Sequence, residues 1–310
     1  MTEDTIIDVQ GLTKVFGKKT VVNGLDMRIR RGEIFGFLGP NGSGKTTSIR
    51  MLCGLLKPDG GSGTCLGYDV VKESALIKPH VGYMTQKFSL YEDLTVRENI
   101  EFTARVFGLK DASKKVDECI ERMGLGPFAK QLAGSLSGGW KQRLSLGVST
   151  LHSPRLLLLD EPTAGVDPGA RRDFWDQVHL LASQGVTALI STHYMDEAER
   201  CHRLAYIAYG KLLASGTADA MIRDSALATW KVSPGGGSEG LHALSEEMKP
   251  LAGVDQVVAF GNTLHVSGRD HEALERSIGP YRDTYDWRQI DTSLEEVFID
   301  LMQQSRGALK

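Results

Sequence analysis

The stretch GPNGSGKT, residues 39–46, decides the fold of this sequence. It fits the pattern GxxxxGK[ST]; the apolar run Ile34–Leu38 before it indicates a buried strand, and residues 46–53 indicate a helix. Glycines in such a loop let backbone N–H groups converge on phosphate oxygens, and the helix N-terminus adds a favourable dipole. We therefore predict a nucleoside-triphosphate site rather than a glycine-rich turn with an incidental lysine. Its expected nucleotide-binding residues are Gly39, Pro40, Asn41, Gly42, Ser43, Gly44, Lys45, Thr46 and Thr47.

Two side chains of this loop and two acids further along the chain carry the expected chemistry. We expect Lys45 to reach the β- and γ-phosphates and Thr46 to bind Mg²⁺ through its hydroxyl. The apolar run 156–159 ends at Asp160, which a buried strand would carry to the Mg²⁺ shell, and the adjacent Glu161 is free to polarise water. Such an acid pair is a weak signal alone, but it becomes a strong one beside the glycine-rich loop.

Length and charge exclude several other classes of protein. The chain has 310 residues, which predicts two domains, and 36 Lys and Arg against 39 Asp and Glu give a net charge of −3. That balance argues against a nucleic-acid coat or a polybasic membrane binder. Apolar residues make up 41% of the chain and charged residues 24%, as in soluble globular proteins.

Segments that would cross a membrane or bind zinc are not expected. No uncharged apolar run approaches the ~18 residues of a membrane span, and the N-terminus, MTEDTIIDVQ, lacks a signal-peptide stretch. Any membrane role therefore needs a partner chain. The cysteines form no CxxC pair, which favours a reducing cytosol over a disulfide framework or a zinc site. They are Cys53, Cys65, Cys119 and Cys201.

In the first two-thirds of the chain, short β-rich runs alternate with helical stretches, which predicts an α/β domain with a largely parallel sheet. Further strands are expected at residues 81–85 and 186–191. Thr95 and Glu98 form a capping box that opens a helix toward Gly108. Asp167, followed by Pro168, caps an amphipathic helix that runs to about residue 182.

After Asp224 the composition changes, and a small second unit is expected. Its predicted strands span residues 229–233, 254–260, 263–266 and 284–290, and its helices span 241–251 and 271–278. This βαββαβ order predicts a ferredoxin-like domain. Thr292 and Glu295 then cap a final helix. The alternative is that residues 235–238 (GGGS) form a flexible linker and that the tail is a loosely tied appendage.

A third motif, Leu136-Ser137-Gly138-Gly139, lies between the loop and the acidic strand. By itself, Ser-Gly-Gly at the start of a helix is more often a simple cap. In this position, however, the sequence over residues 6–217 resembles the ATP-binding subunit of ABC transporters. The resemblance implies that this stretch is the signature motif, whose amides at Ser137, Gly138 and Gly139 grip the γ-phosphate held by the opposite subunit.

The other landmarks of that family occur in order along the chain. The resemblance implies that Gln86 senses Mg²⁺ and water, that Asp167 belongs to the D-loop and that His193 contacts the γ-phosphate. A lone histidine at a strand end is otherwise more often structural. Phe16 matches the aromatic residue that stacks on adenine, although Tyr is commoner there. Trp140 replaces the usual Gln of the signature motif, which weakens the expectation of edge contacts to the opposing nucleotide.

The resemblance implies a P-loop NTPase fold, with an ABC ATPase cassette over residues 1–224 that contains a helical subdomain at about 87–150. An α+β accessory domain is expected over residues 225–310. The expected cofactors are ATP and Mg²⁺, and the expected metal ligands are Thr46, Gln86 and Asp160. Expected catalytic residues are Glu161, which activates water, together with Lys45, His193 and Gln86. The nucleotide ligands expected outside the glycine-rich loop are Phe16, Ser137, Gly138, Gly139 and Asp167.

The expected function is that of the ATP-hydrolysing subunit of an ABC exporter that moves drugs or other amphipathic compounds. Residues 191–199 (STHYMDEAE) and 293–298 (SLEEVF) look like those of such exporters. The expected partners are a second copy or a closely related ATPase subunit and a separate membrane-spanning permease, which the family contacts near residues 92–126. The chain would then lie in the cytoplasm, on the inner face of the membrane. The alternative is a soluble ABC-type ATPase that acts mechanically on ribosomes or DNA, although the acidic balance gives no nucleic-acid footprint.

Overall fold

The computed structural model describes residues 4–234 and 240–307. The chain divides into two compact units, Met1–Ala214 and Ser215–Lys310. This boundary precedes the one that the sequence predicted at residue 224. Helix α8 (Ala218–Ser225), which the prediction placed in the cassette, therefore belongs to the second unit. The predicted loop at residues 235–238 lies outside the described residues.

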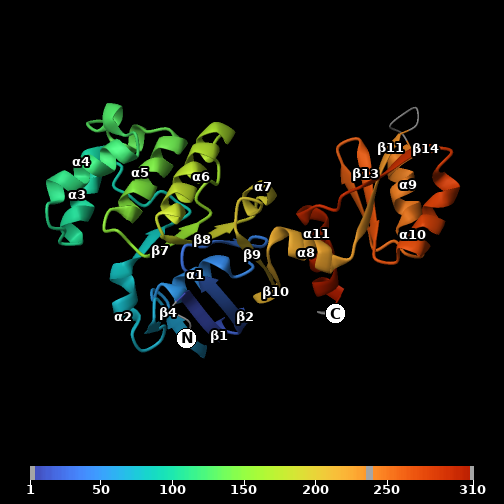
Figure 1. The fold of residues 1–310 in the computed structure, drawn as a ribbon, viewed down its shortest axis with the longest axis horizontal. Helices are drawn as coiled ribbons and strands as arrows, with labels where there is room; N and C mark the ends of the chain where they lie inside the picture. The colour runs from blue at the N-terminus through green and yellow to red at the C-terminus, as the bar shows by residue number, and fades with distance from the viewer. Residues whose placement is uncertain (1–3, 235–239, 308–310) are drawn as a thin grey trace. The chain divides into compact units, whose positions relative to one another are not determined.

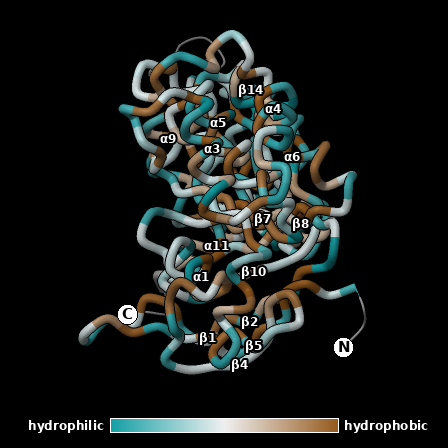
Figure 2. Tube along the Cα trace, turned by 90° about the vertical axis from the view of Figure 1, so that its left-hand side faces the viewer, coloured by the Kyte–Doolittle hydropathy of each residue, from teal (hydrophilic) through white to brown (hydrophobic). Residues whose placement is uncertain are grey.

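A six-stranded sheet in the order β10-β9-β3-β8-β7-β6 forms the centre of the first unit. The pairs β3–β8, β3–β9, β7–β8 and β6–β7 are parallel, which confirms the predicted parallel sheet. Strands β3, β7 and β8 are buried along their whole length, and β7 and β8 run as brown, hydrophobic segments in Figure 2. The strands are β3 (Ile34–Leu38), β6 (Val81–Met84), β7 (Leu156–Asp160), β8 (Thr187–Thr192), β9 (Arg203–Ala208) and β10 (Lys211–Gly216).

A second, antiparallel sheet in the order β2-β1-β4-β5 shares a hydrophobic core with the first. The sequence patterns did not indicate its two long strands. Gly11 and Gly24 have φ of 63° and 66°, and several register shifts occur between β1 and β2, so the apolar alternation is repeatedly interrupted. Its strands are β1 (Thr5–Phe16), β2 (Lys19–Arg30), β4 (Gly60–Cys65) and β5 (Tyr68–Asp69).

Helices α3 (Val96–Val106), α4 (Ala112–Arg122) and α5 (Gly138–Thr150) pack on one another, and α6 (Pro168–Ser183) lies beside α5 (Figure 1). The predicted capping box of Thr95 is present at the start of α3, and the predicted Asp167 cap is present at α6. Within the described ranges, no helix is both long enough and apolar enough to cross a membrane. The remaining helices of this unit are α1 (Lys45–Leu52), α2 (Ser74–Ile77), α7 (Met195–Ala198), and the 3₁₀ turns η1 (Lys78–His80), η2 (Gly126–Phe128) and η3 (Ala133–Ser135).

The second unit contains a four-stranded antiparallel sheet in the order β12-β13-β11-β14. Its elements follow one another in the predicted βαββαβ order. Apolar side chains of one sheet face, including Val232 and Leu264, pack with Leu244 and Leu274 from the two helices. The elements are β11 (Ala228–Pro234), α9 (Leu241–Met248), β12 (Gln256–Phe260), β13 (Thr263–Gly268), α10 (His271–Ile278), η5 (Gly279–Tyr281), β14 (Tyr285–Ile290) and α11 (Leu294–Gly307).

Polar contacts attach α11 to this sheet. His265 Nδ1 lies 2.7 Å from Glu296 Oε1, and Ser293 N donates to Glu296 Oε2 at 2.8 Å. The helix cap is therefore formed by Ser293 and Glu296, one residue later than predicted. The reason is that the Thr292 hydroxyl is engaged elsewhere, since it donates to Leu227 O at 2.9 Å.

A chain that ends at Thr217 would keep β10 whole and remove everything from α8 onward. The hydrophobic cores of the first unit consist, among the described residues, of its own side chains. We therefore expect this shortened chain to fold and bind ATP, because boundaries crossed by few contacts tolerate such cuts. Gel filtration, thermal unfolding and nucleotide fluorescence test this. An insoluble product at every end point tried between residues 214 and 225 would contradict it.

Candidate active site

The glycine-rich loop leaves the carboxyl end of β3 and leads into α1, as predicted. Gly39, Gly42 and Gly44 have φ of 151°, 78° and 108°, a region that side chains rarely adopt. At Gly39 the backbone also approaches β9 closely, since a Cβ there would lie 2.0 Å from Ile207 O. The loop can therefore keep its course only with glycine at this position.

Lys45 is enclosed by this loop. Its Nζ donates to Gly39 O at 2.6 Å and to Pro40 O at 3.2 Å, and it lies 3.4 Å from Glu161 Oε1. Both charged side chains are more than nine-tenths buried. Burial lowers the pKa of the Lys45 ammonium, and the negative charge of Glu161 acts against that shift. An ammonium held by neutral carbonyls can exchange them for phosphate oxygens, which are stronger acceptors because they carry charge.

The Glu161 carboxylate is the point at which the predicted catalytic side chains meet. Gln86 Nε2 donates to its Oε2 at 2.9 Å, and His193 Nδ1 lies 3.3 Å from the same oxygen, without the alignment of a hydrogen bond. Lys45 contacts its other oxygen. Glu161 itself has φ of 46°, an uncommon left-handed conformation for a residue with a side chain, and such strain is concentrated at functional positions.

Asp160 and Thr46 lie together beside this cluster. Thr46 Oγ1 donates to Asp160 Oδ1 at 3.1 Å. Ser191, which the sequence analysis did not single out, donates to the same oxygen at 2.6 Å, and its hydroxyl accepts from Glu161 N at 2.9 Å. Its position directly opposite Asp160 in the β7–β8 pair explains this double role. Its place two residues before His193 at the end of a strand was the available sequence signal.

The side chains around Asp160 suit a small divalent cation. Thr46 offers a hydroxyl, Asp160 a carboxylate and Gln86 an amide oxygen, all of which are hard oxygen donors of the kind that Mg²⁺ prefers. Within the described ranges no cluster of three or more His, Cys, Asp or Glu side chains could hold a metal alone. This donor set is thus typical of an ion that is shared with phosphate oxygens.

Some of the predicted nucleotide ligands do not line the cavity beside Lys45 and Glu161. A cavity of about 300 Å³ is lined by Val21, residues 41–47, Gln86 and Glu161. Phe16, at the end of β1, is outside this lining and half exposed, with Lys14 Nζ 5.5 Å from its ring centre. The signature glycines are also outside it.

The signature motif instead lies beside the D-loop. A Cβ added to Gly139 would lie 2.6 Å from Ala170 Cβ and 3.9 Å from Asp167 Oδ2. Ser137 is the first residue before α5, and its side chain makes no capping hydrogen bond. The amides at the start of α5 are therefore not capped by that hydroxyl.

A parallel sheet with a glycine-rich phosphate loop after one strand and an acid pair after another defines a P-loop nucleoside triphosphatase. The chain matches the family described as "ABC transporter" over residues 22–164. The chain is 45% identical, over 225 residues, to the probable multidrug ABC transporter ATP-binding protein YbhF of Escherichia coli (strain K12). That match covers 72% of this chain but 39% of YbhF, so the chain spans well under half of that relative.

Other relatives match over more of their length. The Nod factor export ATP-binding protein I of Rhizobium sp. (strain N33) is 38% identical over 302 residues, which cover 95% of this chain and 96% of that protein. A solved ATP-binding subunit of an ABC transporter superposes with a TM-score of 0.64 at 27% identity, covering 71% of this chain and 92% of that one. This chain belongs to the ATP-binding subunits of ABC transporters, a family that hydrolyses ATP.

Glu161→Gln should separate ATP binding from hydrolysis. The amide keeps the shape of the side chain but cannot accept a proton from water, so we expect turnover to fall by about 10²–10⁴ while ATP still binds. Phosphate release and a fluorescent-nucleotide titration on the same sample measure the two properties. The variant should also accumulate as an ATP-bound dimer on gel filtration. Turnover near that of the wild type would show that another group is the base.

Proposed function

We propose that this chain is the ATP-hydrolysing subunit of an ABC exporter and that Glu161 is its general base. The observation that carries the proposal is the convergence of Lys45, Gln86 and His193 on one buried carboxylate. Lys45 exchanges Glu161 for phosphate oxygens when ATP binds, and the released carboxylate oxygen can then take a proton from the attacking water.

Catalysis in this proposal consists of positioning and electrostatics. Lys45 and His193 hold the charge that develops on the γ-phosphate, and Gln86 orients the carboxylate through its amide. Mg²⁺, held by Thr46, Asp160 and Gln86, would neutralise phosphate charge. Phe16 offers an exposed aromatic face for the adenine ring.

We further propose that two copies form each complete site together. The start of α5, at Ser137, Gly138 and Gly139, lies outside the cavity of its own chain. In a dimer with twofold symmetry, each copy would supply Lys45 to one site and Ser137 to the other. The Asp167 segment, which lies beside Gly139, would reach the same interface.

Mixing two inactive variants tests this arrangement. Lys45→Ala and Ser137→Arg should each inactivate both sites of a homodimer. In a mixed dimer, one site carries both defects and the other carries none, so mixing should restore part of the ATPase activity. Differentially tagged chains show whether subunits have exchanged.

A second pairing supplies the control for this experiment. If confirmed mixed dimers stay inactive, a chain carrying both substitutions is paired with the wild type. Shared sites would then each be damaged once and lose activity, whereas sites built within one chain would leave the wild-type subunit fully active. The second result would contradict the shared-site proposal.

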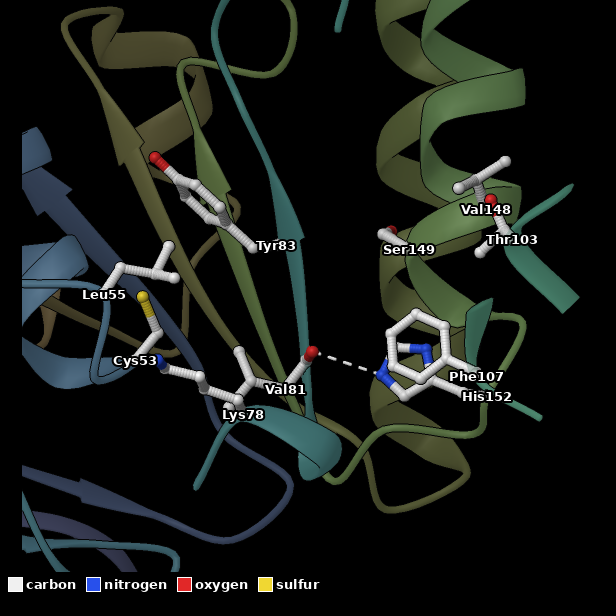
Figure 3. Close-up of a pocket in the computed structure, with 10 residues that line it drawn as sticks. All are labelled: Cys53, Leu55, Lys78, Val81, Tyr83, Thr103, Phe107, Val148, Ser149 and His152. Atoms are coloured by element: carbon white, nitrogen blue, oxygen red, sulfur yellow. Dashed lines mark hydrogen bonds between the residues drawn. The ribbon is translucent and has the colours of Figure 1, made fainter. Parts of the chain in front are cut away.

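An apolar groove supports docking to a membrane-spanning permease. A cavity of about 270 Å³ has Leu55 and Tyr83 on its sheet side and Phe107 and His152 on its helical side, as Figure 3 shows. His152 Nε2 lies 3.1 Å from Val81 O across this space, and its ring stacks on Phe107 with centroids 4.0 Å apart.

Exposed apolar side chains occur in this groove and on α3, which contributes Thr103 to the groove lining. Leu55 is 53% exposed and Val106, beside Phe107 on α3, is 66% exposed. Tyr91 and Phe102 are also exposed and touch each other edge to face, with centroids 5.1 Å apart. Apolar groups that gather on a surface in this way mark a protein contact. Because Gln86 lies two residues beyond the end of β6, which carries Val81 and Tyr83, a partner seated here could act on the Glu161 cluster.

The names of two relatives support the proposed class of transported compounds. One relative is named for multidrug transport and another for Nod factor export, which supports efflux of amphipathic compounds. The chain would work in the cytoplasm, held on the inner face of the cell membrane by its permease.

Leu55→Glu tests the docking surface. A charge in the groove should prevent capture of a membrane-spanning partner from mild detergent extracts, while ATP binding by the purified chain stays as in the wild type. Leu180→Glu is the matched control, since Leu180 is 46% exposed on α6 and outside the groove lining. Equal capture by both variants would contradict the assigned surface. Co-sedimentation of the wild type with ribosomes or DNA, and no membrane partner, would contradict the transporter role.

A further inference from the structure

A buried carboxylate near the nucleotide cavity has no role in the chemistry described so far. Glu197 lies on the short helix α7 and is fully buried. Burying a carboxylate is costly unless its charge and its lone pairs find partners. The partners of Glu197 therefore indicate which segments it holds together.

Side chains from two other segments of the first unit meet at this carboxylate. Thr192 Oγ1 donates to Glu197 Oε2 at 2.7 Å, and Thr163 Oγ1 donates to Oε1. Arg171 Nε lies 3.5 Å from Oε1, close enough for an ion pair but not aligned as a hydrogen bond. Both threonines are 1% exposed, so solvent cannot readily replace Glu197 as their acceptor.

The positions of these partners along the chain show which segments the contacts connect. Thr192 directly precedes His193. Thr163 lies between Glu161 and Asp167, and Arg171 N donates to Asp167 O at 2.9 Å in the first turn of α6. One carboxylate thus joins the switch segment, Thr192 to Tyr194, to the segment 163–171, which contains the D-loop.

Arg171 makes a second link between the same two segments. Its guanidinium carbon lies 4.4 Å from the centre of the Tyr194 ring, and its Nη1 lies 3.3 Å from Asp196 Oδ2. The Tyr194 ring in turn contacts the His193 ring, with centroids 4.1 Å apart. His193 is therefore braced on one side through Thr192 and on the other through Tyr194.

We propose, on the basis of the roles proposed above for Glu161 and His193, that Glu197 is a positioning residue that locks the switch segment to the segment 163–171. Neither segment can move alone, because that movement would leave the buried carboxylate short of a donor. His193 then reaches its working position only together with the D-loop of its own chain. Since Asp167 lies beside Gly139, the same link reaches the signature motif.

Removing one hydroxyl at a time tests this lock in the full-length chain. Thr192→Val and Thr163→Val each keep the side-chain shape but delete the donor to Glu197. Thr192→Val also removes the hydroxyl that accepts from Tyr194 N at 3.0 Å, so Thr163→Val is the cleaner variant. We expect each to lower kcat about 10- to 100-fold, because a displaced His193 is poorly placed, while the Kd for ATP changes less than about threefold. Thr192→Ser and Thr163→Ser keep the hydroxyl, so each should restore kcat to within about threefold of the wild type.

The double variant Thr163→Val/Thr192→Val is the sharpest measurement. If both hydroxyls act through one lock, breaking either already separates the segments, so the double variant should have the kcat of the slower single variant. A kcat reduced by the product of the two single effects would overturn the proposal. So would wild-type kcat in either single variant, or serine variants as slow as the valine variants.

Two carboxylate variants control for simple loss of a buried charge. Glu197→Gln should show the same fall in kcat with retained ATP affinity, because the amide cannot accept from both threonines in the same way or pair with Arg171. Glu33→Gln makes the same change at another buried glutamate, which lies 3.3 Å from Arg203 at the opposite end of β3, and it should leave kcat unchanged. Equal loss in both variants would overturn a specific role for Glu197.

Glu161→Gln, measured in parallel, separates this inference from the proposed function. If Glu161→Gln turns over like the wild type, the catalytic assignment fails. If Glu161→Gln is inactive while both valine variants keep wild-type kcat, the assignment stands and the positioning role of Glu197 fails.

Discussion

The buried pair of Lys45 and Glu161 is the interaction on which the rest of the nucleotide site depends. Each charge is kept in the interior by the other, and removing one partner of such a pair costs about 3–5 kcal/mol. The pair can form because β3 and β7 end at the same edge of the parallel sheet, with β8 between them. Because β8 lies between them, residues at its end also reach this place. Ser191 donates to Asp160, and His193 Nδ1 lies 3.3 Å from Glu161 Oε2.

A feature of the fold or of the site could be predicted from the sequence where the residues that define it lie close together in the chain. The glycine-rich loop, the lysine and the acid pair were predictable because spacing along a few residues defines them. The contact of Ser191 with Asp160 depends on the register of two strands about 30 residues apart, which no local pattern encodes. Placement of α8 in the second unit reflects its packing on α11, far along the chain. Phe16 and Ser137 stay predictions, because a nucleotide and a second copy would complete their contacts.

The two units show two ways of stabilising a sheet. The first buries β3, β7 and β8 on both faces, so these strands are almost continuously apolar and easily recognised in sequence. The second packs helices α9 and α10 on one face and holds α11 through hydroxyl, carboxylate and imidazole groups. Its strands consequently alternate, and its polar contacts could not be read from hydropathy. Separate cores also mean that the two units can unfold in separate steps.

The left-handed backbone at Glu161 sets two energies against each other at a single position. Glycine adopts this conformation without cost, whereas a residue with a side chain meets about 1–3 kcal/mol of backbone strain. Glycine would, however, leave the buried Lys45 ammonium without its charge partner, which costs about 3–5 kcal/mol. The ion pair therefore outweighs the strain, and in the absence of nucleotide the fold itself favours a carboxylate at this position.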